Sequence, residues 1–388
     1  MLLYILLFAC TLFWYLISKD NNTRNVRGLL IFSFSLAIFV GCSDMFGGYD
    51  RYIYGEVFDR LADDIEKGWS YKDSIIMDYE KEFGYVFLNV LLSHITPNRY
   101  IFILIVTFII YALLFLSIKE YTDNYPFACL LFLALMFFFT FTYLREIIGV
   151  LIGWLSMKYI YQRNLKMFLL VMFLAFSFHN SAIIFLPMYF IPIRKYNIPL
   201  ILIIMSISFT IGLTSIPGVL FTRFGEISGS EERVMQYTWD YEQSGFRIEY
   251  LIEAIVFLSI IFSKYTSIPD NKKYLVFLNC SLMFCAILLF FIRSSSGGRL
   301  GWYYMMGVIA LFTHLTVNHN VYKNVRVELI LLSFLLYMRL VISWGIRIYP
   351  YKTFFTNGHR EGDGVYLKYE YDKNYDLDKF YRPAFRIN

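Results

Sequence analysis

The chain has 388 residues, of which 58% are hydrophobic and 20% aromatic, and its mean hydropathy is +0.53. A soluble globular domain is about 45–50% apolar, so this composition excludes a soluble fold and predicts an all-α, polytopic integral membrane protein. The net charge of +5 lies mainly in short loops between apolar runs, as in cytoplasmic loops, and gives no reason to expect nucleic acid as a partner.

Apolar runs recur along almost the whole chain. They lie at residues 1–18, 28–43, 83–96, 100–118, 126–143, 146–161, 165–178, 181–193, 198–220, 248–264, 274–292, 300–317 and 327–344. A helix needs about 20 apolar residues to cross a bilayer, so the runs at 83–96, 165–178 and 181–193 are expected to be tilted, broken or re-entrant. We predict about 10–12 transmembrane helices in a single membrane domain over residues 1–344, followed by a polar, aromatic tail over 345–388.

The charges in the loops predict the orientation. The first run has no basic residue ahead of it, and Lys19, Arg24 and Arg27 follow it, so we expect a retained span rather than a secretory signal. Basic clusters mark cytoplasmic loops. The others are Arg163/Lys166, Arg194/Lys195, Lys264/Lys272/Lys273 and Lys323/Arg326.

Residues 44–82 carry eleven acidic and five basic side chains, which places this segment outside the cytoplasm. The loop 221–247, the turn 293–299 and the tail fall on the same side. This topology requires residues 83–96 not to complete a crossing and residues 165–193 to enter and return as a broken hairpin. Four polar residues then share the outer face: Arg145, His179, Arg293 and Arg299.

The outer segment begins with Gly47-Gly48-Tyr49-Asp50-Arg51-Tyr52. Aromatic rings can cover the apolar face of a sugar while a carboxylate accepts hydrogen bonds from its hydroxyls. Tyr49, Asp50 and Arg51 are therefore candidate substrate-binding residues. The alternative is an interfacial aromatic belt beside a solvated acidic loop.

Glu82 ends the outer segment just ahead of the short run 83–96. A carboxylate at a membrane boundary is a candidate base or sugar contact. It is equally well explained as a charge that favours the amino terminus of a helix.

Arg145 stands between two apolar runs and begins the second one. Its planar guanidinium suits phosphate oxygens, and the amino end of a helix adds donors for an anion. The alternative is an arginine that extends to the lipid headgroups, or one that Glu146 neutralises.

His179 lies between two short apolar runs, followed by Asn180 and Ser181. A neutral imidazole can act as a base or a donor near neutral pH, so His179 is a candidate catalytic residue. The alternative is a structural histidine that only packs.

Arg293 and Arg299 flank a turn of serines and glycines, and Tyr303 follows on the next run. Backbone amides in such a turn can approach an anion. The alternative is an ordinary connection between two spans.

Several signals for cofactors and metals are missing from the sequence. The five cysteines contain no CxxC pair, and no Walker loop, HExxH or GxSxG motif is present. The DxD letters of Asp376-Leu377-Asp378 stand in the tail without a nucleotide-binding domain around them. We therefore expect no metal and no cofactor.

The chain resembles the EpsG-type, Wzy-like polysaccharide polymerases of bacterial cytoplasmic membranes. The resemblance rests on short stretches in a common order. They are Gly48-Tyr49-Asp50 with Tyr54 and Phe58, Glu82-Phe83-Gly84-Tyr85, Tyr143-Leu144-Arg145, Phe178-His179-Asn180-Ser181-Ala182, and Arg299 ahead of Tyr303-Tyr304. Asn180 stands where family members commonly have lysine.

The resemblance implies a multi-pass glycosyltransferase that joins undecaprenyl-pyrophosphate-linked oligosaccharide repeat units at the outer face of the membrane, as in the synthesis of O-antigen, capsule or exopolysaccharide. Arginines would hold the pyrophosphate and replace a metal, and His179 or Glu82 would serve as base. Membrane lipid, a chain-length regulator and a flippase would be its partners. The competing hypotheses are a transporter or flippase for lipid-linked oligosaccharide, and a non-enzymatic assembly partner.

Overall fold

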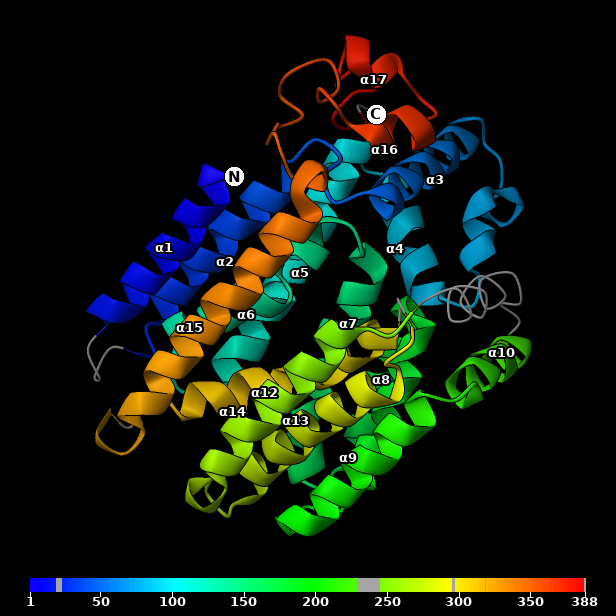
Figure 1. The fold of residues 1–388 in the computed structure, drawn as a ribbon. Coiled ribbons are helices and arrows are strands. Elements are labelled where there is room, and N and C mark those ends of the chain that lie inside the picture. The colour runs from blue at the N-terminus through cyan, green and yellow to red at the C-terminus, as the bar shows by residue number, and fades with distance from the viewer. Residues whose placement is uncertain (19–22, 229–244, 295–296, 318, 387–388) are drawn as a thin grey trace. The chain divides into compact units, whose positions relative to one another are not determined.

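The computed structural model describes residues 1–18, 23–228, 245–294, 297–317 and 319–386, which form helices and no named strand (Figure 1). One isolated antiparallel bridge joins Ser43 and Thr353. The predicted all-α membrane fold is confirmed. Most helices coincide with the apolar runs to within a few residues, because burial of apolar side chains decides where they form.

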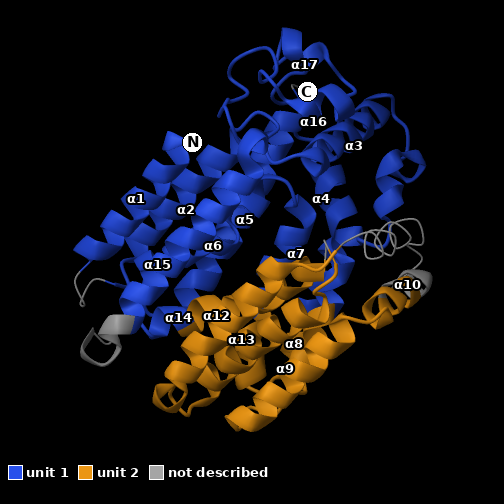
Figure 2. Cartoon of the chain, viewed as in Figure 1, with its two compact units in different colours: residues 1–155, 170–183, 312–388 blue, residues 156–169, 184–311 orange. Residues whose placement is uncertain are grey.

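The described residues form two compact units (Figure 2). Unit 1 comprises residues 1–155, 170–183 and 312–388, and unit 2 comprises residues 156–169 and 184–311. Helices α7 (Leu144–Tyr161) and α8 (Leu165–Phe178) pass from one unit to the other. The two units are described separately.

Unit 1 contains a bundle of apolar helices (Figure 1). Its members are α1 (Leu2–Ile17), α2 (Val26–Gly41), α5 (Arg99–Tyr121), α6 (Tyr125–Leu135), the short η4 (Phe137–Phe141) and α15 (His319–Trp344). Helix α2 packs along α5, while α1 and α15 pack along α6. A Cβ at Gly41 would lie 2.6 Å from Cδ1 of Leu104, so glycine permits the close approach of α2 and α5.

The outer segment 44–82, expected to be a loop, contains an 18-residue helix, α3 (Tyr49–Glu66). It is followed by η2 (Tyr71–Asp73), η3 (Ile75–Tyr79) and α4 (Phe83–Ser93). Helix α3 buries Tyr54, Phe58 and Leu61 on one face. The frequent charges between these residues obscured the helical period.

The tail packs on α3 and the start of α5. It contains η8 (Gly345–Arg347), α16 (Gly364–Tyr369) and α17 (Asn374–Leu377). Arg99 binds Asp59 of α3 and, through Nη1 at 2.9 Å, both carboxylate oxygens of Glu370. Because Arg99 and Glu370 are buried, this contact fixes the tail on α3.

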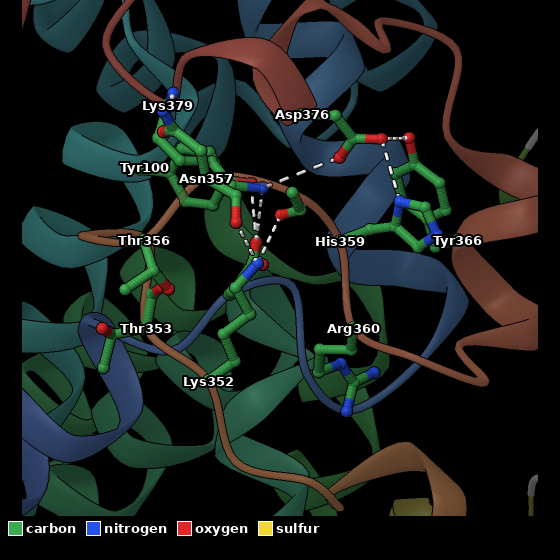
Figure 3. A network of polar contacts seen from close by, with 12 residues as sticks. Tyr100, Lys352, Thr353, Thr356, Asn357, His359, Arg360, Tyr366, Asp376 and Lys379 are labelled. Atoms are coloured by element: carbon green, nitrogen blue, oxygen red, sulfur yellow. Dashed lines mark hydrogen bonds and ion pairs between the residues drawn. The ribbon is translucent and has the colours of Figure 1, made fainter.

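A second polar network holds the tail near Lys352 and Lys379 (Figure 3). The Lys379 ammonium donates to the Tyr100 hydroxyl at 3.2 Å and to Asp44 at 3.3 Å. The carboxylate of Asp376 contacts Tyr366 and, at 3.0 Å, Nδ1 of His359. Asp376, the first aspartate of the DxD sequence, is thus part of a structural hydrogen-bond network.

Unit 2 is built around α13 (Lys272–Phe290), which packs against α9 (Ile198–Gly212) and α12 (Ile248–Ser263). The other elements are α10 (Ile216–Ser228), η6 (Tyr265–Ser267), η7 (Gly297–Gly301) and most of α14 (Trp302–His314). A Cβ at Gly212 would lie 2.7 Å from the Phe290 carbonyl oxygen, and one at Gly307 2.9 Å from that of Phe277. Small residues therefore let these helices approach closely.

In the part of the chain that the structure describes, three helical stretches are long and apolar enough to cross a membrane: Arg99–Tyr121, Lys272–Phe290 and Val325–Arg347. Shorter apolar helices accompany them in the described residues. Helix α4 has eleven residues, about 17 Å at 1.5 Å per residue, which is too short for the roughly 30 Å hydrocarbon core. The number of crossings and their orientation stay predictions.

The run 165–193 forms a hairpin that breaks at His179, as predicted. Helix α8 ends at Phe178, and η5 (Asn180–Tyr189) begins one residue after the histidine. The two ends of the hairpin meet, since Arg163 donates to the Tyr189 carbonyl at 2.8 Å and the Phe168 and Tyr189 rings lie 5.0 Å apart.

Candidate functional site

A buried ion pair joins Arg145 and Glu82, two of the three predicted catalytic residues. Arg145 lies in the first turn of α7, and Glu82 immediately precedes α4. Arg145 Nη1 donates to Glu82 Oε2, and the two side chains are only 12% and 4% exposed. The ion pair thus brings together two residues that are 63 positions apart in the sequence.

Two tyrosines enclose the guanidinium. Arg145 Nε donates to the Tyr54 hydroxyl at 3.3 Å, and the guanidinium carbon lies 4.7 Å from the centroid of the Tyr79 ring. Burial raises the pKa of Tyr54 well above its ordinary value, although the charge of Arg145 lowers it. Tyr54 is therefore a neutral phenol near pH 7 and positions Arg145 rather than acting as a base.

The turn at His179 reaches the same carboxylate. The Asn180 backbone N–H donates to Glu82 Oε1 at 3.3 Å. His179 Nδ1 accepts from the Ser181 backbone N–H at 3.3 Å and lies 2.5 Å from the Ser181 hydroxyl oxygen. Because Nδ1 accepts from a backbone N–H, neutral His179 carries its proton on Nε2 in this geometry, which favours a donor role over a base role.

Gly84 explains how α4 approaches this turn. A Cβ at position 84 would lie 3.0 Å from Cβ and 3.1 Å from the carbonyl oxygen of Ser177 in α8. Beside this contact the Phe83 and Phe173 rings pack 5.4 Å apart. Glycine in the Glu82-Phe83-Gly84-Tyr85 stretch thus brings Glu82 to the His179 turn.

Tyr49 and Asp50, predicted to bind substrate, begin α3. The Tyr49 side chain is 48% exposed, and its ring packs edge-on against Tyr369 of the tail at 4.4 Å. Burial raises the pKa of Tyr49, and the nearby Asp50, Tyr371, Tyr369 and Tyr79 raise it further.

Arg51 is placed differently from the prediction. It is fully buried and donates to the backbone carbonyls of Phe141, Ser43 and Val40 at 2.8, 2.9 and 3.1 Å. Burial lowers its pKa to about 10, so it remains a cation at pH 7. This position argues for a structural role, with Arg51 binding carbonyls at the carboxyl ends of α2 and η4, and against contact with substrate.

Arg293, Arg299 and Tyr303 belong to unit 2 and are described only with it. Arg293 donates to the Leu213 carbonyl at 3.3 Å, Arg299 lies in η7, and Tyr303 is fully buried in α14. Their predicted role in binding substrate stays a prediction. Ser295 and Ser296 of the turn, and residues 229–244 of the predicted outer loop 221–247, lie outside the described residues.

Among the described residues no group of three or more His, Cys, Asp or Glu side chains is placed to hold a metal ion. Tyr79 is a site residue that the sequence did not single out. Its only signal was an aromatic ring near the end of an acidic segment, and its contact with Arg145 depends on the tertiary structure.

The helical fold and its apolar helices define a polytopic membrane protein. The model of the EpsG family matches residues 26–353. The chain therefore belongs to the EpsG family, a family of membrane proteins of the polysaccharide-polymerase type, as the resemblance predicted. The matched region includes Glu82, Arg145 and His179 and ends before most of the tail. No curated protein and no solved structure matches the chain.

Proposed function

We propose that the protein is a membrane glycosyltransferase that polymerises undecaprenyl-pyrophosphate-linked oligosaccharide repeat units at the outer face of the bacterial cytoplasmic membrane. The observation that carries this proposal is the enclosed Arg145–Glu82 pair with the His179 turn on the same carboxylate. Family membership supports the polymerase class.

In the proposed reaction an acceptor hydroxyl oxygen forms a bond to the anomeric carbon of the donor glycan. The bond from that carbon to the pyrophosphate oxygen breaks, and undecaprenyl pyrophosphate leaves with the electron pair. A guanidinium has five N–H donors, so Arg145 can bind phosphate oxygens while it keeps its contacts with Glu82 and Tyr54. It stabilises the charge that develops on the leaving group.

The proton of the acceptor hydroxyl needs a base near the same point. Glu82 is the better candidate in this geometry. Each of its carboxylate oxygens has two lone pairs and can accept the proton beside its contacts with Arg145 and Asn180, whereas the single lone pair of His179 Nδ1 already accepts a backbone hydrogen bond. His179 would donate from Nε2 and orient the sugar or the leaving group. In this proposal the arginine, rather than a metal, neutralises the pyrophosphate.

The test is in vitro polymerisation. Lipid-linked repeats extracted from a strain that lacks the protein are incubated with the purified full chain in lipid nanodiscs, and the products are separated by size. We expect a ladder of oligomers with the wild type and single repeats with Arg145→Ala. Transport of repeats across liposomes without a ladder would instead identify a flippase.

A further inference from the structure

The tail beyond residue 353 lies outside the region that the family model matches, yet it is packed against the first turn of α3. We infer that Tyr369 and Tyr371 of the tail complete a sugar-binding subsite with Tyr49 and Asp50, which takes a pyranose ring of the lipid-linked oligosaccharide, an inference that rests on the proposed function.

Two of these rings are in contact, and Tyr49 and Tyr371 are well exposed. Tyr49 is 48% exposed and Tyr371 59% exposed, while the Tyr369 ring meets Tyr49 edge-on at 4.4 Å. Asp50 lies beside Tyr49 in the first turn of α3. Rings that cover the apolar face of a sugar and a carboxylate that accepts from its hydroxyls are the groups that a pyranose requires.

The residue between the two tail tyrosines fixes their position. Glu370 is buried, with both carboxylate oxygens 2.9 Å from Arg99 Nη1. Asp363 caps α16 by accepting from the backbone N–H groups of Val365 and Tyr366 at 3.1 and 2.9 Å. The tyrosines on either side of Glu370 are therefore held in place before a ligand arrives, which lowers the entropic cost of binding.

The subsite and the Arg145 site share helix α3. Tyr49 begins this helix, and Tyr54, five residues further on, accepts a hydrogen bond from Arg145 Nε at 3.3 Å. Five helical residues rise about 7.5 Å, so a glycan bound on the tail tyrosines would lie close to the pyrophosphate-binding arginine. Asp50 follows Tyr49 in α3 and supplies a carboxylate that can accept hydrogen bonds from sugar hydroxyls. An aromatic belt at the lipid headgroups does not require such an acceptor, so Asp50 favours a sugar as the ligand.

The experiment measures binding of a defined probe. The probe is the free oligosaccharide released by mild acid from lipid-linked repeats of a strain that lacks the protein, and binding to the full chain in nanodiscs is followed by saturation-transfer NMR. Tyr369→Ala and Tyr371→Ala should each weaken binding about two- to tenfold, the range expected for loss of one aromatic contact. Tyr371→Phe should keep near-normal affinity because it keeps the ring.

The matched control is Phe355→Ala, which removes a tail ring that is 65% exposed but packs on Phe354. It should bind like the wild type. In the polymerisation assay the tyrosine variants should raise KM for the repeat unit and leave kcat unchanged. A general defect of the tail would lower kcat or the yield of folded protein as well, and would contradict the inference.

The possible failures are distinguishable. A wild-type ladder with unchanged binding and KM in both alanine variants overturns the subsite alone. If the wild type binds the oligosaccharide but forms no ladder, and the tyrosine variants lose this binding, the subsite is supported and the polymerase activity is overturned. A wild type that neither binds the oligosaccharide nor forms a ladder overturns both.

Discussion

At the scale of single residues, Arg145 makes more specific contacts than an arginine that only extends to the lipid headgroups would need. It pairs with Glu82, donates to Tyr54 and lies on the Tyr79 ring. An ammonium ion is a point charge and cannot reproduce this planar fork. The enclosure therefore predicts that the shape of the cation matters as well as its charge.

We expect Arg145→Lys to lose polymer formation nearly as completely as Arg145→Ala. By analogy with a lost oxyanion donor, the cost is about 2.7–4 kcal/mol in the transition state, or roughly a hundredfold or more in rate. Initial rates of ladder formation at equal protein level measure it. Normal polymer from the lysine variant would show that Arg145 acts only through its charge.

For His179 the hydrogen bond that Nδ1 accepts leads to a specific prediction. His179→Ala should abolish polymer while the protein remains folded and single lipid-linked repeats accumulate. His179→Gln should keep part of the activity, because glutamine can donate a hydrogen bond but cannot take a proton near pH 7. If glutamine is as inactive as alanine, His179 is the base after all, and a parallel loss of protein abundance would indicate a packing role.

The sequence identified Glu82, Arg145 and His179 because charged and polar groups among apolar runs are conspicuous. It could not show that Arg51 binds backbone carbonyls or that Tyr79 covers Arg145. The sequence around an arginine or a tyrosine does not reveal whether the side chain contacts a ligand or other parts of the protein. Only the tertiary partners distinguish the roles.

At the scale of elements, the contact between α4 and α8 sets the position of Glu82. Gly84→Ala places a methyl group against the backbone and side chain of Ser177. We expect a loss of stability of about 1–3 kcal/mol, typical of overpacking, together with loss of activity as Glu82 moves. Thermal unfolding in detergent and ladder formation measure the two effects.

Gly364→Ala is the matched control, because nothing lies within 4 Å of the added atom. A second change, Ser177→Gly, removes the side chain that the methyl group meets and should restore part of the lost activity. Equal behaviour of Gly84→Ala and Gly364→Ala would show that the close approach is unimportant.

The tail is a second element whose position is testable. Glu370→Ala leaves Arg99 buried with one carboxylate partner fewer, and breaking a buried pair typically costs about 3–5 kcal/mol. We expect the tail to become sensitive to limited proteolysis while the bundle stays intact. Glu361→Ala, at an exposed tail position, should leave the cleavage pattern unchanged, and identical patterns for both variants would contradict the anchoring role.

The elements that the sequence predicted well are the apolar helices and the break at His179, since hydrophobic runs and a polar interruption are local signals. Helix α3 was missed because eight of its eighteen residues are charged, whereas its buried face depends on the tail and α5. The tail has no strong period, and distant residues such as Arg99 determine its structure.

At the scale of the whole molecule, orientation in the membrane rests on charge. We predict that a cysteine at Lys67 faces outward and one at Lys272 faces the cytoplasm; both positions are exposed. The background is Cys10→Ser, because the other four cysteines are buried. An impermeant maleimide on intact cells should label the first cysteine only, and labelling of both from outside would overturn the topology.

The bond between Arg99 and Glu370 joins residues 271 positions apart, which has a consequence for biosynthesis. At about 5–20 residues per second, the ribosome adds Glu370 roughly 15–55 s after Arg99. During that interval Arg99 lacks one of its two carboxylates, and α3 lacks its cover. A nascent chain thus acquires the second counter-charge of Arg99 and the tyrosines beside Glu370 at the same moment, well after α3 and α5 have been synthesised.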